Sequence, residues 1–262
     1  MTATARAPAP PRATVVLVHG PCLGPWIWAD HVIPHLERLG LRCFAPDLHE
    51  ARPRADWSPS VARVSIDRYA DRLHAMLARV QGPRILVGHS LGARVVEALV
   101  ERGLHDGVVL VSPTPPDGLE AEARRLAARW PVALARAVLA RRPLLLLGEP
   151  GRPDPARVRT LLLEPRAPDA LVARVADALR DEPYVACLGW LRARPPAPPA
   201  RAVPVLVVSG RDDPLVTPAA LRRTAVAWDA VAQVIPHAGH CPMLGASGPA
   251  LARRIGRWLL DD

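Results

Sequence analysis

The sequence predicts an α/β domain, a mostly parallel sheet of six strands flanked by helices. Short runs that are apolar on both faces alternate with amphipathic segments over most of the chain, and this alternation is typical of a parallel sheet buried between helices. A second observation is a Gly-x-Ser-x-Gly sequence at residues 88–92, which joins one apolar run to a helical pattern. The 262 residues suffice for one such domain with a substantial core.

The individual elements follow from the spacing of apolar residues. Six runs are predicted to be strands: residues 14–18, 42–45, 84–87, 108–111, 205–208 and 233–235. Helical spacing predicts core helices at residues 28–39, 66–80, 91–102, 218–228 and 251–260. Thr217 is the expected N-cap of the fourth of these helices, because its hydroxyl precedes Pro218 at the first helical position.

The stretch from residue 113 to residue 202 interrupts this rhythm. It has no strand signal, and arginine-rich helical patterns at residues 120–130, 132–140 and 170–179 are separated by proline-rich breaks. An insertion of this length between two strands is usually functional. We therefore expect a helical lid at 113–202 between two parts of the core, 13–112 and 203–262, after a disordered lead-in at 1–12.

Composition narrows the function classes. The net charge of +9 invites a nucleic-acid interpretation, but the arginines are scattered and no aromatic residues alternate with them. No run of about 18 apolar residues is present, which argues against a membrane span. The four cysteines form no CxxC pair and no zinc pattern. We expect reduced thiols in a cytoplasmic protein, with no metal, no cofactor, no nucleic-acid partner and no membrane partner.

The turn at Ser90 predicts a nucleophile. Side chains at Gly88 and Gly92 would clash in so tight a turn, and the following helix directs N–H groups with a partial positive charge at the reacting centre. A strand, Gly-x-Ser-x-Gly and a helix in this order form the nucleophile elbow of the α/β-hydrolase fold. The chain resembles the α/β-hydrolase family over nearly its whole length, from Val15 onward.

A serine of this kind needs a base, and the base needs an orienting acid. The fold supplies them in the order serine, acid, histidine, and two segments after predicted strands, "SGRDDPLV" and "PHAGHCPM", carry candidates. Resemblance to the family's Gly-x-x-Asp turn selects Asp213 over Asp212. We expect Asp212 to cap or brace the turn instead. The family's Gly-His pair selects His240 over His237.

An oxyanion hole is the fourth part that the resemblance implies. Its first donor is the N–H of Leu91, at the start of the helix after the serine. The Gly-x-Trp-x-Trp sequence at residues 24–28 resembles the branch of plant methylesterases and hydroxynitrile lyases, in which the residue after His-Gly is the second donor. Here that residue is Pro21, which has no N–H. Either Cys22 donates instead, or another group assists a single backbone donor, or the alignment is one residue off.

These motifs imply a serine hydrolase that cleaves an ester, lactone or thioester of a small hydrophobic substrate through Ser90, His240 and Asp213. The missing N–H of Pro21 leaves open a non-hydrolytic enzyme of the same fold, namely a lyase, a cyclase or an acyl transferase. A receptor that keeps the fold without turnover is a third possibility, which the intact triad disfavours.

Substrate contacts are predicted from the aromatic and basic residues. Trp28, near the oxyanion loop, and Trp130, in the lid, are candidate substrate-binding residues. Six lid arginines offer either a solvated helix face or a site for an anionic, acyl-carrier or CoA-linked substrate: Arg124, Arg125, Arg129, Arg136, Arg141 and Arg142. The oligomeric state is not readable from the sequence.

Overall fold

The computed structural model describes residues 12–49, 59–103, 105–195 and 203–261. The expected lead-in lies almost wholly outside these residues. The predicted sheet is confirmed: six strands lie in the order β2-β1-β3-β4-β7-β8, and every neighbouring pair is parallel. Their bounds are β1 Thr14–Val18, β2 Arg42–Phe44, β3 Arg84–His89, β4 Gly107–Val111, β7 Val205–Gly210 and β8 Ala232–Ile235.

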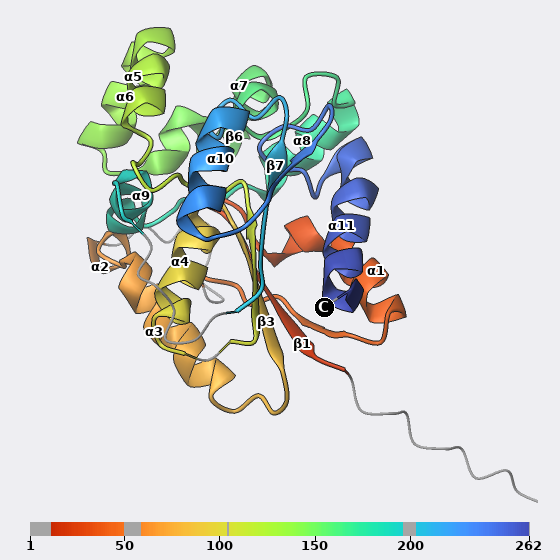
Figure 1. Cartoon of the computed structure of the whole chain (residues 1–262). Coiled ribbons are helices and arrows are strands. Elements are labelled where there is room, and N and C mark those ends of the chain that lie inside the picture. The colour runs from red at the N-terminus through yellow and green to blue at the C-terminus, as the bar shows by residue number, and fades with distance from the viewer. Residues whose placement is uncertain (1–11, 50–58, 104, 196–202, 262) are drawn as a thin grey trace, which may run out of the picture.

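Helices cover both faces of this sheet (Figure 1). Helices α1 and α11 pack together on one face, and α3, α4 and α10 lie on the other. Their bounds are α1 Val32–Arg38, α3 Ile66–Leu77, α4 Leu91–Val100, α10 Pro218–Ala227 and α11 Gly248–Asp261. Every residue of β1 and β4 is buried, as a sheet between two helical layers requires. Among the described residues, no helix combines the length and apolarity of a bilayer span.

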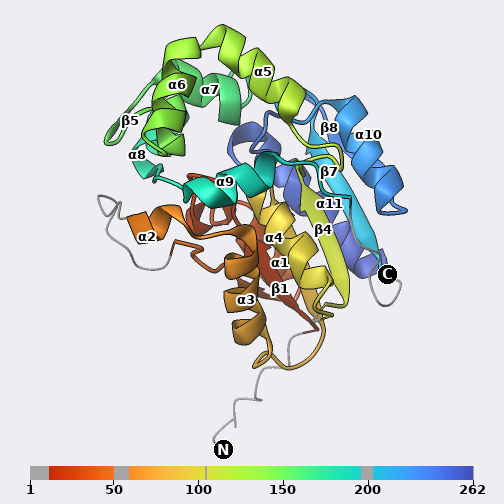
Figure 2. The ribbon, with the colours of Figure 1, turned by 90° about the vertical axis from the view of Figure 1, so that its left-hand side faces the viewer.

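A second group of helices lies between β4 and β7 in the chain and above the carboxyl ends of the strands (Figure 2). These elements are α5 Glu120–Arg129, α6 Pro131–Leu139, η2 Pro143–Leu146, α7 Pro155–Leu162, α8 Asp169–Ala178 and α9 Tyr184–Leu191. The expectation of no strand here is wrong in one detail, because β5 Gly148–Glu149 pairs with β6 Arg152–Pro153. Two residues per strand are too few for a periodic signal. Two short helices, α2 Pro59–Ala62 and η3 Gly245–Ser247, lie elsewhere in the chain.

One predicted helix is divided. The segment 28–39 was expected to be continuous, but the structure has a 3-10 helix η1 at Pro25–Trp28 and begins α1 at Val32. Pro34 explains the break, because its ring would clash with the carbonyl four residues earlier in a longer helix. In the first turn of α1 its missing N–H costs nothing. Thr217 caps α10 as predicted, its hydroxyl accepting the N–H of Ala220 at 3.2 Å.

The strand order places the ends of β1 and β3 side by side. From β1 the chain first adds β2 on one side and then returns to add β3 on the other. In open α/β sheets, ligands bind outside the carboxyl ends of the strands at such a reversal. His19 and Gly20 follow β1, and Ser90 follows β3. The fold therefore brings the two predicted halves of the reaction centre together.

Candidate active site

Ser90 occupies a strained turn between β3 and α4. Its φ of 55° and ψ of −116° are rare for a residue with a side chain. The neighbouring glycines allow this turn: a Cβ at Gly88 would overlap the backbone of α4, and one at Gly92 would overlap the carbonyls that end β1. The backbone N–H of Ser90 donates to the carbonyl of Val111 at 3.0 Å. The turn thus fixes the hydroxyl at the edge of the sheet.

Three side chains that are far apart in the sequence form one hydrogen-bonded row. The Nε2 atom of His240 lies 2.9 Å from the hydroxyl oxygen of Ser90. The Nδ1 atom of the same ring lies 2.9 Å from one carboxylate oxygen of Asp213 and 3.1 Å from the other. All three residues are buried. The geometry therefore lets the imidazole accept the serine proton while the carboxylate orients the ring.

Asp213 is held ionised by its surroundings. Burial raises the pKa of its carboxyl group, but the nearby His240 and the hydrogen bonds to the carboxylate outweigh burial, so the pKa lies below the usual value. One oxygen accepts the N–H groups of Leu215 at 2.8 Å and Val216 at 2.9 Å, and the other accepts the hydroxyl of Ser209 at 2.9 Å. Asp212, by contrast, is exposed.

Two further side chains position His240 through its backbone carbonyl. His89 contacts this oxygen through Nε2 at 2.9 Å, and the hydroxyl of Ser112 donates to it at 2.9 Å. Burial, together with the neighbouring His240, lowers the pKa of His89 to about 3, so His89 is neutral and its Nε2 carries the proton. His237, the runner-up base, is exposed. The structure thus brings His240, and not His237, to Ser90.

The loop after β1 approaches the serine closely. A Cβ at Gly20 would lie 3.2 Å from the Cβ of Ser90, so this position has no room for a side chain. Leu91 is the first residue of α4, and its N–H has no intrahelical acceptor. That N–H is therefore available beside the serine. Pro21 follows Gly20 and offers no donor.

The structure does not support Cys22 as the substitute donor in this conformation. Its backbone N–H donates to the carboxylate of Glu182 at 3.1 Å. An N–H that points at a buried carboxylate is not available to an oxyanion. Burial, followed by the nearby carboxylates of Glu182 and Asp181, raises the pKa of the Cys22 thiol, which keeps the thiol neutral.

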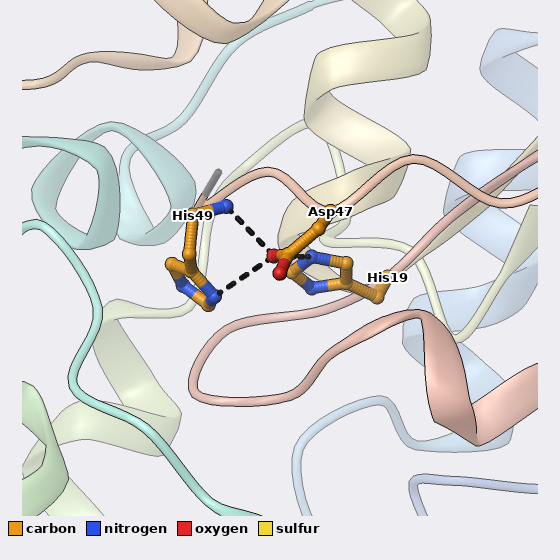
Figure 3. Close-up of side chains that lie close together, drawn as sticks. All are labelled: His19, Asp47 and His49. Carbon is orange, nitrogen blue, oxygen red and sulfur yellow. Dashed lines mark hydrogen bonds and ion pairs between the residues drawn. The ribbon is translucent and has the colours of Figure 1, made fainter. Parts of the chain in front are cut away.

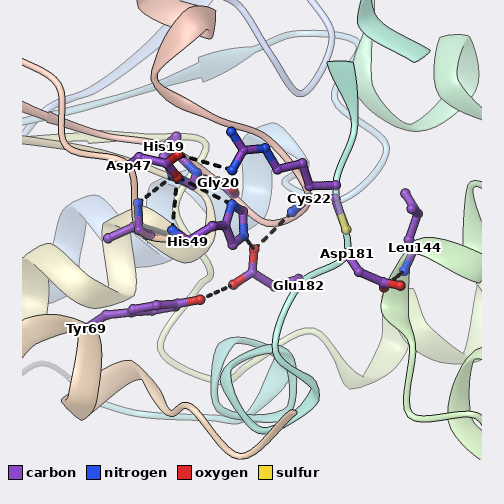
Figure 4. Close-up of polar contacts among 11 residues, drawn as sticks. His19, Gly20, Cys22, Asp47, His49, Tyr69, Leu144, Asp181 and Glu182 are labelled. Atoms are coloured by element: carbon purple, nitrogen blue, oxygen red, sulfur yellow. Dashed lines mark hydrogen bonds and ion pairs between the residues drawn. The ribbon is translucent and has the colours of Figure 1, made fainter. Parts of the chain in front are cut away.

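Glu182 is the centre of a second buried network, which sequence reasoning missed (Figure 4). Its carboxylate contacts Nε2 of His49 at 2.8 Å and accepts the hydroxyl of Tyr69 at 2.9 Å, besides the N–H of Cys22. Burial raises the pKa of this fully buried group, but the charge and hydrogen bond of His49, with further contacts, bring it below the usual value. No local pattern marks Glu182, because its partners lie more than a hundred residues earlier in the chain.

His19, Asp47 and His49 form the one side-chain cluster among the described residues whose ligand atoms are close enough to suggest a metal site (Figure 3). Backbone and side-chain donors already use these atoms. Nε2 of His19 accepts the N–H of Leu48 at 3.0 Å, and Asp47 accepts the N–H of His49 at 3.0 Å and a guanidinium N–H of Arg180 at 3.1 Å. We therefore assign the cluster to bracing the loop after β1.

An apolar cavity of about 170 Å³ opens above the reaction centre. His240, His89, Pro21 and Cys22 lie among its lining residues, and lid elements supply most of the rest, including Leu126, Leu134, Leu146, Leu162, Leu188 and Trp190. Among the described lining residues, Glu122 is the only aspartate, glutamate, lysine or arginine. Its carboxylate pairs with the guanidinium of Arg125 at 2.8 Å. The cavity therefore favours an uncharged, apolar group.

The two predicted substrate-binding tryptophans lie elsewhere. Neither Trp28 nor Trp130 is among the described residues that line the cavity. Trp28 is fully buried with its ring edge-on to His89, and Trp130 lies under the guanidinium of Arg129 at 5.0 Å. Trp190 lines the cavity instead, because α9 presents that part of its surface to the site. Which face of a lid helix turns inward depends on tertiary packing.

Comparison with known proteins agrees with this geometry. The family model described as the alpha/beta hydrolase family matches residues 15–254. The pyrethroid hydrolase of Sphingobium wenxiniae is 37% identical over 87 residues, which cover 33% of this chain and only 30% of that relative.

Two solved structures share the fold over nearly the whole chain. The thermophilic esterase of Thermogutta terrifontis has a TM-score of 0.68 at 24% identity, covering 96% of this chain and 90% of that one. Polyneuridine aldehyde esterase has a TM-score of 0.64 at 20% identity, covering 96% and 98%. The resemblance inferred from the Gly-x-Ser-x-Gly elbow is confirmed: the chain belongs to the alpha/beta hydrolase family.

Proposed function

We propose that the protein is a serine hydrolase that cleaves an ester of a small hydrophobic substrate. The observation that carries this proposal is the continuous row from Asp213 through His240 to Ser90, with contacts of 2.9 Å on each side of the imidazole. His240, the middle member of this row, lines an apolar cavity. The names of the relatives, a pyrethroid hydrolase and two esterases, support the same class.

The mechanism follows from the donors and acceptors at each atom. Ser90 Oγ attacks the ester carbonyl carbon while His240 Nε2 takes its proton, and the N–H of Leu91 stabilises the oxyanion. The tetrahedral intermediate collapses, and His240 returns the proton to the leaving alcohol. Water, deprotonated by the same ring, then attacks the acyl-enzyme and releases the acid. Asp213 holds the ring and stabilises the transient imidazolium.

The cavity supports an apolar acyl or aryl group rather than an anionic one. A thioester or lactone would undergo the same steps, and an acyl-carrier or CoA-linked substrate would have its charged part at the lid surface. Several lid arginines have acidic partners there: Arg124 pairs with Glu120 and Arg136 with Glu149. This pairing weakens their attraction for an anion. All four cysteines are free, which supports a reducing, cytoplasmic setting.

Labelling of the serine tests the proposal. A fluorophosphonate probe should modify the wild-type protein at Ser90 and leave Ser90→Ala unmodified. With p-nitrophenyl esters, kcat/KM should increase from acetate to hexanoate, because each added methylene buries more apolar surface in the cavity. The matched variant Asp212→Asn changes an exposed neighbour of the triad and should behave as wild type. An unlabelled wild-type protein, or turnover retained in Ser90→Ala, would contradict a serine hydrolase.

Pro21 favours a second candidate, a non-hydrolytic reaction of the same site. The lack of a second backbone donor in the oxyanion hole has less effect on a reaction that forms no tetrahedral intermediate. A lyase, cyclase or acyl transferase would use His240 as an acid–base group and would retain turnover in Ser90→Ala unless an acyl-enzyme is needed. The same variant therefore separates the lyase and the cyclase from the hydrolase.

A further inference from the structure

The loop after β1 turns over at Pro21 and Cys22. The N–H of Leu23 donates to the carbonyl of Gly20 at 3.4 Å, which closes a β-turn. The proline fixes a negative φ at the second position, and Cys22 at the third position has a φ of 60°. This combination defines a type II turn, whose third position is ordinarily glycine or asparagine. Cys22 therefore adopts a backbone conformation that its own side chain disfavours.

The lid holds Cys22 in this conformation from both sides. Its N–H donates to the buried carboxylate of Glu182 at 3.1 Å, and its carbonyl accepts the N–H of Arg180 at 2.9 Å. The ring of His49 and the hydroxyl of Tyr69 fix the carboxylate in turn (Figure 4). Arg180 and Glu182 both lie in the short segment before α9. This one segment therefore positions the Glu182 carboxylate and also holds the turn at Cys22.

This type II turn becomes the common type I turn when the plane of the Pro21–Cys22 peptide rotates by about half a turn. Types II and I differ in ψ of the second residue and φ of the third, so only the Pro21–Cys22 plane reverses. The contact between Gly20 and Leu23 and the contact of the Cys22 carbonyl with Arg180 both survive the change. Because the peptide is trans, its carbonyl points opposite to its N–H. Reversal exchanges the two groups, and type I gives Cys22 the negative φ that it prefers.

We propose that Glu182 is a positioning residue that controls the orientation of the Pro21–Cys22 peptide, and that reversal of this peptide gives the oxyanion on Ser90 its second donor, the N–H of Cys22. The inference rests on the proposed function. Pro21 and Cys22 line the cavity together with His240, and the preceding residue, Gly20, has no space for a Cβ beside Ser90. The N–H exchanges one negative acceptor, the lid carboxylate, for another, the oxyanion.

Cysteine-selective ¹⁵N labelling makes this exchange observable, because the chain has four cysteines and so gives four amide signals. Cys22→Ala assigns the signal of interest by removing it. In the free protein, Glu182→Gln should move the Cys22 amide proton upfield, since a neutral amide oxygen is a weaker acceptor than a carboxylate. After a fluorophosphonate has modified Ser90, wild type and Glu182→Gln should give the same Cys22 shift, because Glu182 is no longer the acceptor. The signal of Cys43 on β2 serves as the unaffected reference.

The outcomes separate clearly. If the Cys22 shift in the modified protein still depends on Glu182→Gln as it does in the free protein, the peptide has not reversed and the inference is wrong. If Ser90 is not modified in wild type, the proposed function fails first. If the Cys22 shift depends on Glu182→Gln in the free protein but not after modification of Ser90, the proposed function and the inference are both supported.

Kinetics of Cys22 variants provide a test that does not disturb the buried carboxylate. Cys22→Gly removes the steric penalty of the type II turn and should slow phosphonylation of Ser90 and lower kcat about fivefold, with KM nearly unchanged. Cys22→Ala removes the same thiol but keeps a Cβ, so the glycine variant should be about fivefold slower than the alanine variant. Glu182→Gln should act in the opposite direction and raise kcat about threefold, because it weakens the contact that opposes reversal. Equal rates for the glycine and alanine variants would overturn the inference.

Discussion

Two buried histidines, His240 and His49, each lie beside a buried carboxylate, and only one is placed for proton transfer. His240 contacts Asp213 through Nδ1 and Ser90 through Nε2. His49 has carboxylates on both sides, Glu182 at 2.8 Å from Nε2 and Asp47 at 3.6 Å from Nδ1. The first ring contacts a hydroxyl through Nε2, whereas the second ring lies between two carboxylates.

The comparison shows that a histidine–carboxylate pair is not by itself a catalytic feature. In the first pair, the far nitrogen faces a side chain on a strained turn at the cavity. In the second, the carboxylate also binds the backbone N–H of Cys22 and the hydroxyl of Tyr69, so the network fixes the shape of a loop. We therefore expect changes in the first network to reduce kcat, and changes in the second to reduce stability with a smaller effect on turnover.

The largest expected effect is on the orienting acid. Asp213→Asn should lower kcat by about 10⁴, because an amide no longer holds the imidazole in the tautomer that accepts the serine proton. Its free energy of unfolding should also fall by about 1–3 kcal/mol, because Ser209, Leu215 and Val216 lose an ionised acceptor. Asp212→Asn, one residue earlier and exposed, is the control and should retain full kcat. A loss of less than tenfold in Asp213→Asn would mean that this network does not carry the chemistry.

The second prediction concerns the missing donor. Pro21→Ala places an N–H at the position that serves the oxyanion in the branch that the sequence resembles, and kcat should rise by no more than about threefold, because the Cys22 N–H already serves the oxyanion once its peptide has reversed and the new donor removes only the need for that reversal. Pro25→Ala, at the start of η1, adds an N–H away from Ser90 and should leave kcat unchanged. A rise of about 10²-fold or more would show that the Cys22 N–H is not the second donor and would contradict the reversal of the Pro21–Cys22 peptide.

The sequence predicted the first network because its parts are local. The Gly-x-Ser-x-Gly turn, the Gly-x-x-Asp turn and the Gly-His pair each lie at the end of a recognisable strand, and parallel strands end at the same edge of the sheet. The sequence therefore predicted that Ser90, Asp213 and His240 would meet, and in the structure their side chains are in hydrogen-bond contact. The six strands of the sheet were predicted for the same reason, but their order comes from the structure.

The second network could not be predicted in this way. Glu182 is separated from Cys22, His49 and Tyr69 by more than a hundred residues each, and the segment between β4 and β7 that carries it contributes no strand to the six-stranded sheet that would define its register. For the same reason, the sequence did not single out Trp190, which is among the described residues that line the cavity. The ends of some helices were also not predicted. The break in the expected helix at residues 28–39 depends on a single proline, Pro34, within an otherwise helical pattern.

The third prediction measures the structural role of Glu182. Glu182→Gln should lower the free energy of unfolding by about 1–3 kcal/mol at pH 7, because three donors lose an ionised acceptor. The pKa of Glu182 lies below its usual value of 4.5 in the folded protein. Its extra stability is therefore present above pH 4.5 and is lost as the pH falls through the folded pKa.

Chemical denaturation of wild type and Glu182→Gln between pH 7 and pH 3 checks this sign. The difference in unfolding free energy should be constant down to about pH 5 and should narrow below it. Glu149→Gln removes an exposed partner of Arg136 and should change stability by less than about 0.5 kcal/mol at any pH. A difference that stays constant to pH 3 would show that folding does not lower the pKa of this carboxyl group.

The last prediction tests how finely the first network is adjusted. Ser209 donates its hydroxyl to the Asp213 oxygen that also contacts His240. Ser209→Ala leaves the carboxylate its two backbone donors, so kcat should fall only about threefold to tenfold. Removing a hydrogen bond to the charged form raises the pKa of Asp213, so the acid limb of the kcat profile should move to higher pH.

Ser112→Ala is the matched control, because the Ser112 hydroxyl donates to the backbone carbonyl of His240 rather than to the carboxylate. Its acid limb should stay where it is in wild type, and an equal displacement in both variants would mean that the two serines act through the position of the His240 loop and not through the charge of Asp213.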